Sequence, residues 1–211
     1  IKRFTQFVLQ NFVSTVRYTK RKENYQMQTI LQRNWTYQSY LTLNDDKMYE
    51  VIQGDLLMVP APSLEHQRIS RDLEYSLIKY VAEKKLGEIF DAPVDVIFDD
   101  DNVVQPDIVF VSKKNSHILK KKGIIGTPDL VCEIISPSTL HRDYYVKKSL
   151  YEKFGVLEYW LIDPGNRVIH VYIPGEHGYE LFSMAAETGE VKSNVIKGFS
   201  IKIEEIIPNR E

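Results

Sequence analysis

Residues 126–139 read GTPDLVCEIISPST, and this stretch gives the clearest indication of the fold class. Its centre, residues 130–135, is a short apolar run interrupted by one charge, Glu133. Runs of this kind are typical of strands that are buried on both faces of a sheet. The sequence SPST at 136–139 then stops the strand and begins a helix.

The segment after this strand predicts a strand–helix–strand crossover. We expect the helix to run from about His141 to Phe154, with Gly155 at its C′ position. A second strand over residues 159–162 follows, closed by the turn DPGN at 163–166. The crossover should be right-handed, as connections between parallel strands nearly always are.

Upstream, residues 48–59 read as two short strands around a Gln-Gly-Asp turn. Ser63 caps a helix that Gly87 ends. An apolar stripe on this helix comprises Ile69, Leu73, Leu77 and Val81. Residues 88–98 and 103–111 then form a hairpin around an acidic turn.

Downstream, residues 168–172 and 179–183 predict further antiparallel strands, and residues 196–207 are short and amphipathic. The fold class is therefore α/β. We expect a mixed sheet flanked by helices, with an extra N-terminal hairpin and C-terminal antiparallel strands.

The composition fits one domain with an added arm. The chain has 211 residues, of which 43% are hydrophobic, so it can bury a core without disulfides. Residues 1–40 form a basic amphipathic arm and linker in this interpretation, and residues 41–211 form the domain. The arm could pack on its own domain or on a partner subunit, which makes a homodimer possible, or be an organelle transit peptide.

Charge and cysteine content exclude some classes of protein. The net charge of -2 argues against a protein that coats nucleic acid non-specifically. Lysines do crowd residues 113–122, where they either hold phosphates or form a solvated loop. No apolar stretch is long enough to span a membrane, and the single cysteine, Cys132, fits a reducing compartment, so we expect a cytoplasmic protein.

Three residues suggest chemistry on a phosphodiester. Asp107 falls in the second strand of the hairpin, Glu133 lies in the apolar strand, and Lys147 lies on the next helix, between Asp143 and Tyr151 at four-residue spacing. Two carboxylates and a backbone carbonyl suit Mg²⁺ or Mn²⁺, and an ammonium beside them would neutralise developing negative charge. The alternative is a structural ion pair between a buried acid and a base.

The motifs resemble a known family when they are taken in order. They are VQPDI at 104–108, the stretch at 126–139, the Asp143, Lys147 and Tyr151 series, and GVLEYWLIDP at 155–164. This pattern, over roughly residues 48–207, is similar to the Uma-two family, bacterial proteins catalogued as a domain of unknown function and classed with the restriction-endonuclease-like enzymes of the PD-(D/E)XK superfamily.

The resemblance implies a restriction-endonuclease-like fold and assigns roles. Asp107 matches the motif aspartate and Glu133 the acidic position, and the metal set would be these two with the carbonyl of Ile134. The superfamily lysine normally follows two residues after the acid, but Ile135 stands there. The resemblance implies that Lys147 has taken over its role.

Five other residues are supporting candidates, each with a structural alternative. His66 could contact substrate or a metal-bound water, or only pack. Asp95 could be a third acid, and Glu50 could reach the site from the N-terminal hairpin, unless both are exposed strand residues. Gln105 shares the strand face of Asp107 by alternation. Tyr151 could bind phosphate, although core packing is favoured.

These observations predict an endonuclease that uses Mg²⁺ or Mn²⁺ to hydrolyse nucleic acid, with DNA as the expected substrate. The alternative is a catalytically weak nucleic-acid-binding or interaction module that keeps the nuclease fold. The low net basicity favours the alternative, and an intact set of Asp107, Glu133 and Lys147 favours the enzyme.

Overall fold

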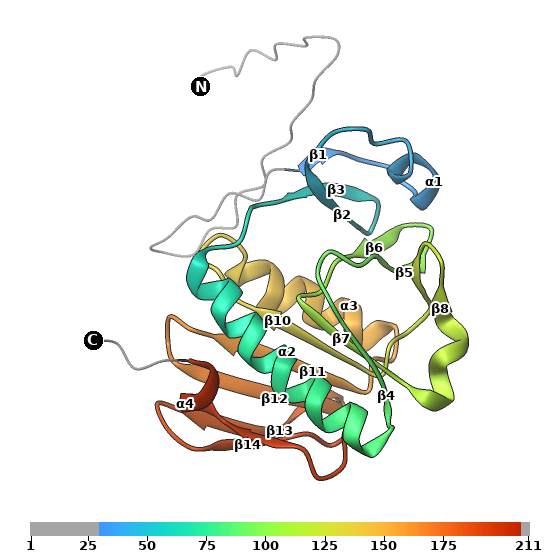
Figure 1. Ribbon diagram of the computed structural model, residues 1–211. Helices are drawn as coiled ribbons and strands as arrows, with labels where there is room; N and C mark the ends of the chain where they lie inside the picture. The colour runs from blue at the N-terminus through green and yellow to red at the C-terminus, as the bar shows by residue number, and fades with distance from the viewer. Residues whose placement is uncertain (1–29, 208–211) are drawn as a thin grey trace, which may run out of the picture.

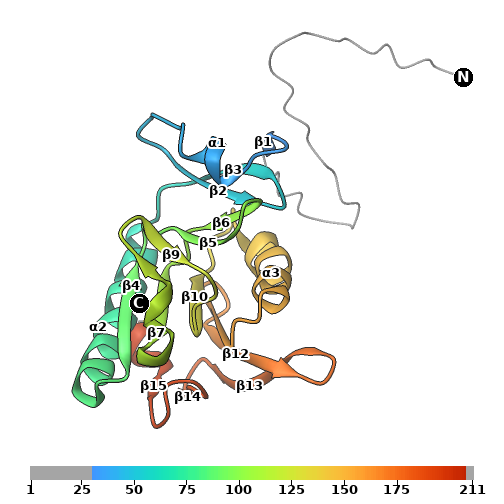
Figure 2. The ribbon, with the colours of Figure 1, turned by 90° about the vertical axis from the view of Figure 1, so that its right-hand side faces the viewer.

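The structure is a computed structural model and describes residues 30–207 of the chain. Two sheets meet in the body of the molecule, with a long helix against one side and a shorter helix between the sheets on the other (Figures 1 and 2). Of the arm and linker predicted at residues 1–40, residues 1–29 lie outside the described residues, whereas residues 30–40 lie within them and contain a short strand and a short helix. No helix within the described range is long and apolar enough to cross a membrane.

A six-stranded mixed sheet forms the centre of the fold. Its strands, in spatial order, are β13 (Gly178–Ala186), β12 (Val168–Gly175), β11 (Glu158–Asp163), β10 (Leu130–Ile134), β7 (Ile108–Ser112) and β4 (Gly87–Asp91). β10 and β11 pair in parallel, whereas the other neighbours are antiparallel. The predicted strand–helix–strand crossover and mixed sheet are confirmed.

A second sheet carries the N-terminal hairpin. Its order is β1 (Ile30–Gln32), β3 (Asp55–Val59), β2 (Met48–Ile52), β6 (Asn102–Val104), β5 (Val96–Asp99), β9 (Gly123–Ile125) and β8 (Leu119–Lys120). Smaller elements outside the two sheets include α1 (Tyr37–Tyr40), the 3₁₀ helix η1 (Lys113–Ile118), the hairpin β14 (Glu190–Lys192) and β15 (Ser200–Lys202), and α4 (Ile203–Ile206). Trp35, Tyr37, Tyr40 and Leu43 pack against this sheet, so residues before Met48 contribute to its outer face.

The long helix α2 (Leu64–Lys84) packs its predicted stripe onto the central sheet. Its four stripe residues are at most 2% exposed and contact apolar residues of β7, β10 and β11. Burying a side chain of this size stabilises the fold by about 1.5–3 kcal/mol. Ser63 caps the helix as expected, but Gly87 does not end it: Lys85, with a φ of 54°, does. Gly87 instead starts β4, where a Cβ would collide with the carbonyl oxygen of Val111.

The predicted long hairpin is divided between the two sheets. The expected strands at 88–98 and 103–111 are each broken, so that β4 and β7 pair in one sheet and β5 and β6 in the other. Pro93 and Pro106 lie at the breaks. Proline has no backbone N–H to donate to a ladder, which explains why both strands stop there. Asp107 therefore lies just before β7 and not within a strand.

Alternation along β10 places Glu133 on the face that points away from α2. Leu130, Cys132 and Ile134 pack in the cluster beneath α2, and Cys132 is a fully buried small hydrophobe. Val131 faces the opposite cluster, with residues of the short helix α3 (Lys148–Lys153). Because side chains alternate, Glu133 emerges toward the helical segment that carries Lys147.

Candidate active site

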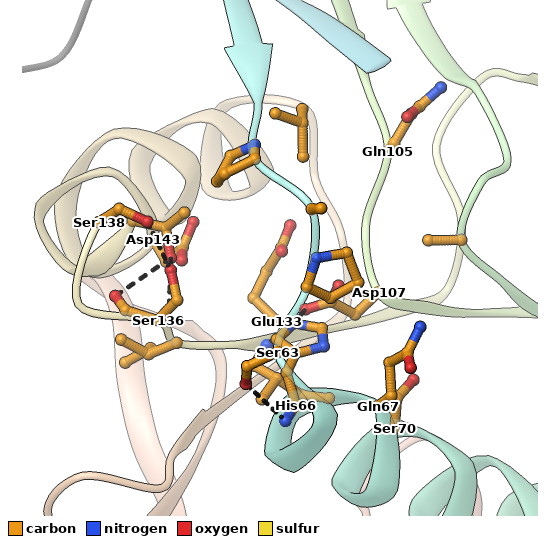
Figure 3. Close-up of a pocket in the computed structure, with 18 of the residues that line it drawn as sticks. Ser63, His66, Gln67, Ser70, Gln105, Asp107, Glu133, Ser136, Ser138 and Asp143 are labelled. Carbon is orange, nitrogen blue, oxygen red and sulfur yellow. Dashed lines mark hydrogen bonds and ion pairs between the residues drawn. The ribbon is translucent and has the colours of Figure 1, made fainter. Parts of the chain in front are cut away.

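A cavity of about 480 Å³ lies beyond the carboxyl ends of β10 and β11, beside the first turn of α2. Figure 3 shows its walls, with Asp107, Glu133 and His66 close together at its base. Glu50 and Lys147 also line it. Open α/β sheets commonly bind ligands beyond the carboxyl ends of their strands. Asp107 and Glu133, 26 positions apart in the sequence, thus face one space.

Lys147 lies at the centre of a buried hydrogen-bonded group. Its Nζ is 2.8 Å from Oε1 of Glu133 and 2.7 Å from Oε1 of Glu50. The hydroxyl of Tyr151 donates a second hydrogen bond, of 2.5 Å, to the same oxygen of Glu133. All four side chains are at most 4% exposed. The structure therefore brings Lys147 to the acid that sequence reasoning paired it with.

The helix that carries Lys147 begins with a π-helical turn, η2 (Arg142–Lys147). A π-helix has hydrogen bonds between residues five apart and winds more residues into each turn than an α-helix, so Arg142 and Lys147 lie closer to one face than α-helical spacing would place them. Nη1 of Arg142 lies 3.5 Å from Oε2 of Glu50, and its Nε lies 3.7 Å from Oδ1 of Asp143. Arg142 was missed by the sequence reasoning because α-helical spacing places it on another face.

Asp107 is held by a different pair of groups. Its Oδ2 accepts a hydrogen bond of 2.7 Å from the backbone N–H of Ile134 and lies 3.1 Å from Nε2 of His66. Burial acts to lower the pKa of His66, but the hydrogen bond and charge of Asp107, with smaller contributions from Asp143 and the Ile134 backbone, raise it above its ordinary value. His66 is thus an Asp107 partner and not merely a packing residue.

The cavity holds more carboxylates than cations. Among the described residues, its lining has three basic side chains, Arg71, Arg142 and Lys147, with His66 beside Asp107. The carboxylates that line it are Glu50, Glu65, Glu74, Asp91, Asp107, Glu133 and Asp143. Burial is the main reason that the pKa of Glu133 rises to about 8, although the ammonium of Lys147 opposes this shift. An excess of buried negative charge is relieved by a proton or by a bound cation.

The residues present fit a divalent cation. Among the described residues no donor bonds to Oδ1 of Asp107 or Oε2 of Glu133, so each carboxylate keeps one oxygen for a ligand. No cluster of three or more His, Cys, Asp or Glu side chains within residues 30–207 could hold a metal alone. Two carboxylates suffice for Mg²⁺, which retains several waters, and a backbone carbonyl can complete the set.

Comparison with known proteins places the chain in a family. A model for Uma2, described as "Putative restriction endonuclease", matches residues 36–204. The chain belongs to the Uma2 family. A solved structure of a putative nuclease belonging to DUF820 from Anabaena variabilis is similar, with a TM-score of 0.69 and 21% identity over 82% of this chain and 97% of that one. No curated protein matches the chain.

The family match and the shared fold confirm two expectations from sequence, the resemblance to Uma-two and the restriction-endonuclease-like α/β fold. The match begins at residue 36, upstream of the region over which the motifs resembled the family. It includes α1, whose Tyr40 donates a hydrogen bond of 2.8 Å to Asp95.

In this Uma2 chain, the side chains of Asp95 and Gln105 do not lie where the sequence predicted them. Asp95 is not among the residues that line the cavity of Glu133, because Tyr40 and Gln105 bind it elsewhere. The side chain of Gln105 points to Asp95 and away from Asp107, since the strand breaks at Pro106 and alternation does not carry through. Gln105 still lines the cavity, and its backbone N–H donates a hydrogen bond of 3.0 Å to Glu50.

Two other supporting candidates, Glu50 and Tyr151, contact Lys147 or Glu133 directly. Glu50 is fully buried and not an exposed strand acid, and it links the second sheet to Lys147. Tyr151 is also fully buried, which agrees with the favoured packing role, but its hydroxyl is bonded to Glu133 and does not line the cavity. Tyr151 is therefore not positioned to bind a phosphate.

The lysine run lines a second hollow of about 380 Å³. Lys120, Lys121 and Lys122 contribute to its walls together with Asp95 and Gln105. Gln105 also lines the first cavity, so the two hollows share a wall. This hollow provides a basic surface next to the carboxylate cavity.

Proposed function

We propose that this chain is a metal-dependent endonuclease that hydrolyses phosphodiester bonds of nucleic acid, with DNA as the expected substrate and Mg²⁺ or Mn²⁺ as the cofactor. The observation that carries the proposal is the contact of 2.8 Å between Lys147 and Glu133, in a cavity that Asp107 also lines. A lysine and two acids around one space can hold a cation and stabilise the negative charge that develops in phosphodiester hydrolysis.

Asp107 and Glu133 would hold the ion, with the carbonyl of Ile134 as a third protein ligand. When bound, the ion supplies a Lewis acid for the phosphoryl oxygen and lowers the pKa of a coordinated water. Each carboxylate keeps one oxygen without a hydrogen bond among the described residues, which supports this assignment.

Lys147 acts as a cation. Burial works against its charge, but Glu133 and Glu50 raise its pKa above the ordinary value, so the amine stays protonated. A protonated amine cannot take a proton from water. It can orient a water molecule or stabilise the negative charge that develops on the phosphoryl group.

Glu50, Tyr151 and His66 position the reacting groups. Glu50 and Glu133 hold the ammonium between them, and Tyr151 fixes the oxygen of Glu133 that faces it. His66 fixes one oxygen of Asp107. Partners of this kind hold catalytic groups in one geometry and contribute to activity without touching the substrate.

The test is nicking of supercoiled plasmid DNA with Mg²⁺ or Mn²⁺. The wild type should nick the plasmid, and Glu133→Ala and Lys147→Met should each lower the rate by about 100-fold or more. Glu74→Gln is the matched control, because Glu74 lines the same cavity but makes no hydrogen bond or ion pair with a described residue. Its activity should stay within about twofold of the wild type, as surface changes usually have small effects.

A thermal melt with Mn²⁺ separates loss of metal from loss of the fold. Saturating ion at about 100 times its Kd should stabilise the wild type by about 2.7 kcal/mol and should not stabilise Glu133→Ala to the same extent. A wild type that binds DNA, gains nothing from Mn²⁺ and leaves the plasmid intact would instead be a binding module that retains the nuclease fold.

A further inference from the structure

A chain of aromatic rings runs along the surface near the cavity. The rings of His141 and Tyr145 are 5.2 Å apart, those of Tyr144 and Tyr145 are 6.4 Å apart, and that of Tyr144 is 6.2 Å from His170. His170 in turn stacks with Tyr172 at 5.9 Å. We call these five residues the aromatic strip.

The strip has an exposed end, His141 and Tyr145, whereas Tyr144 and Tyr172 also pack against the core. Tyr145 is 63% exposed, His141 is exposed, and the other three are partly exposed. Burying such rings would release free energy, so a stretch of them on the surface marks a contact site. The hydroxyl of Tyr144 is bonded to the buried carboxylate of Asp163, which fixes that ring in place.

The strip is continuous with the proposed active site. His141 immediately precedes Arg142 in η2, and the cavity wall includes Arg142 and residues 136–139. At the other end, Pro164 lines the cavity and follows Asp163, the partner of Tyr144. The strip therefore adjoins the cavity wall at two places, next to Arg142 along the chain and through the bond of Tyr144 to Asp163.

A cation accompanies the rings. Nζ of Lys148 lies 3.7 Å from the centre of the Tyr172 ring. Asp163, the acid that bonds to the strip within residues 30–207, is buried and already bonded to Tyr144 and Asn166. The charge of Glu152 acts on Lys148 but not on the rings. Stacking surfaces combined with a positive charge are the features that bind single-stranded nucleic acid, because each base offers a flat face and each linkage a negative charge.

We propose that the aromatic strip binds unpaired bases of a single nucleic-acid strand that enters or leaves the cavity. The bases of a duplex are stacked on one another and would not reach these rings, so the strip favours single-stranded or unwound substrate. This inference rests on the proposed function, since it assigns the substrate of the same cavity.

The test is fluorescence anisotropy with a labelled 20-nucleotide oligothymidine and, separately, a 20-base-pair duplex, both in EDTA. Loss of a stacking ring should weaken single-strand binding by about 5- to 150-fold in Tyr145→Ala, with a much smaller effect on the duplex. Tyr145→Trp should restore binding. Tyr75→Ala is the matched control, since Tyr75 is 68% exposed on α2, outside the strip, and its binding should equal that of the wild type.

A second readout locates the bases. Photocrosslinking of an oligonucleotide with 5-iodouracil, followed by mass spectrometry, should modify Tyr145, Tyr144 or His141. Glu133→Gln should keep single-strand affinity in EDTA even though it cannot nick DNA, so failure of the enzyme proposal and failure of this one are distinguishable.

Three outcomes would overturn the inference: oligothymidine binding by Tyr145→Ala that equals the wild type, crosslinks confined to other surfaces, or no single-strand binding at all. A fourth is a fall from dimer to monomer in Tyr145→Ala, measured by sedimentation, without loss of oligothymidine binding. That result would make the strip a contact between two copies of the chain.

Discussion

The ammonium of Lys147 lies 2.7 Å from Oε1 of Glu50, and the two residues come from different layers of the fold. Glu50 belongs to β2 of the second sheet, whereas Lys147 ends the π-helical turn that follows β10. The same oxygen of Glu50 accepts the N–H of Gln105, where the long hairpin crosses between the sheets. The contact therefore couples the N-terminal hairpin to the candidate active site.

Breaking this contact should destabilise the protein strongly. Removing one partner of a buried ion pair costs about 3–5 kcal/mol, because the other charge is left without compensation. We expect a loss of this size in Glu50→Ala and in Lys147→Met, and a loss in the double variant smaller than their sum, in urea unfolding. Asp72→Ala removes the exposed pair with Arg71 and should cost less than about 1 kcal/mol. Additive losses would show that the two side chains do not interact.

Stability should fall as the pH rises from about 5 to 9, owing to Glu133. Burial raises its pKa to about 8 from an ordinary value of 4.5, so the folded state binds more protons than the unfolded state between these values. Its contribution is complete below about pH 4.5 and is lost as pH rises through 8. Urea titrations in EDTA at pH 6 and pH 9 should show this decrease, by at most about 1.4 kcal/mol per pH unit, and Glu133→Gln should remove much of it. An equal decrease in Glu133→Gln would assign the effect to other groups.

His66 should strengthen metal binding through its contact with Asp107. Replacing a partner that holds a ligating carboxylate typically costs about 10–100-fold in metal affinity or activity, and we expect this range for His66→Ala. Mn²⁺ affinity measured by calorimetry is the direct readout. His117→Ala alters an exposed histidine of η1 and should leave Mn²⁺ binding unchanged. Wild-type affinity in His66→Ala would reduce His66 to a packing role.

The lysine run should contribute phosphate contacts. Replacing Lys120, Lys121 and Lys122 with Gln should weaken DNA binding and make the plot of log K against log salt concentration shallower, because fewer counterions are released. Lys79, Lys84 and Lys85, on and just after α2, give a control with the same change in charge. An unchanged salt slope in the first variant, or an equal change in the control, would contradict a local phosphate path.

Much of the fold was predictable because hydrophobic periodicity follows directly from burial. The apolar stripe from Ile69 to Val81 predicted the helix α2. The apolar run around Glu133 predicted the central strand β10. The division of the hairpin was not anticipated, although Pro93 and Pro106 stood at both breaks. One proline alone is compatible with an edge strand. Because Pro93 and Pro106 lie across from each other in the hairpin, together they mark the point where the hairpin passes from one sheet to the other.

The site residues that lie close together on one regular helix could be predicted from the sequence. Those that depend on an irregular backbone could not. Four-residue spacing linked Lys147 to Tyr151, and both reach Glu133. The π-helical turn places Arg142 beside Glu50, which α-helical spacing does not predict. The contact between Glu50 and Lys147 depends on how the two sheets pack, and no local sequence pattern predicts this packing.

The proposed nuclease activity depends on a metal ion bound by Asp107 and Glu133, and crystals of the protein soaked in Mn²⁺ would show whether it binds there. Anomalous difference density should show one ion in the cavity, bonded to an oxygen of Asp107 and an oxygen of Glu133, and this density should be missing in crystals of Glu133→Ala. A cavity without density at saturating Mn²⁺, with Glu133 still bonded only to Lys147 and Tyr151, would contradict the account.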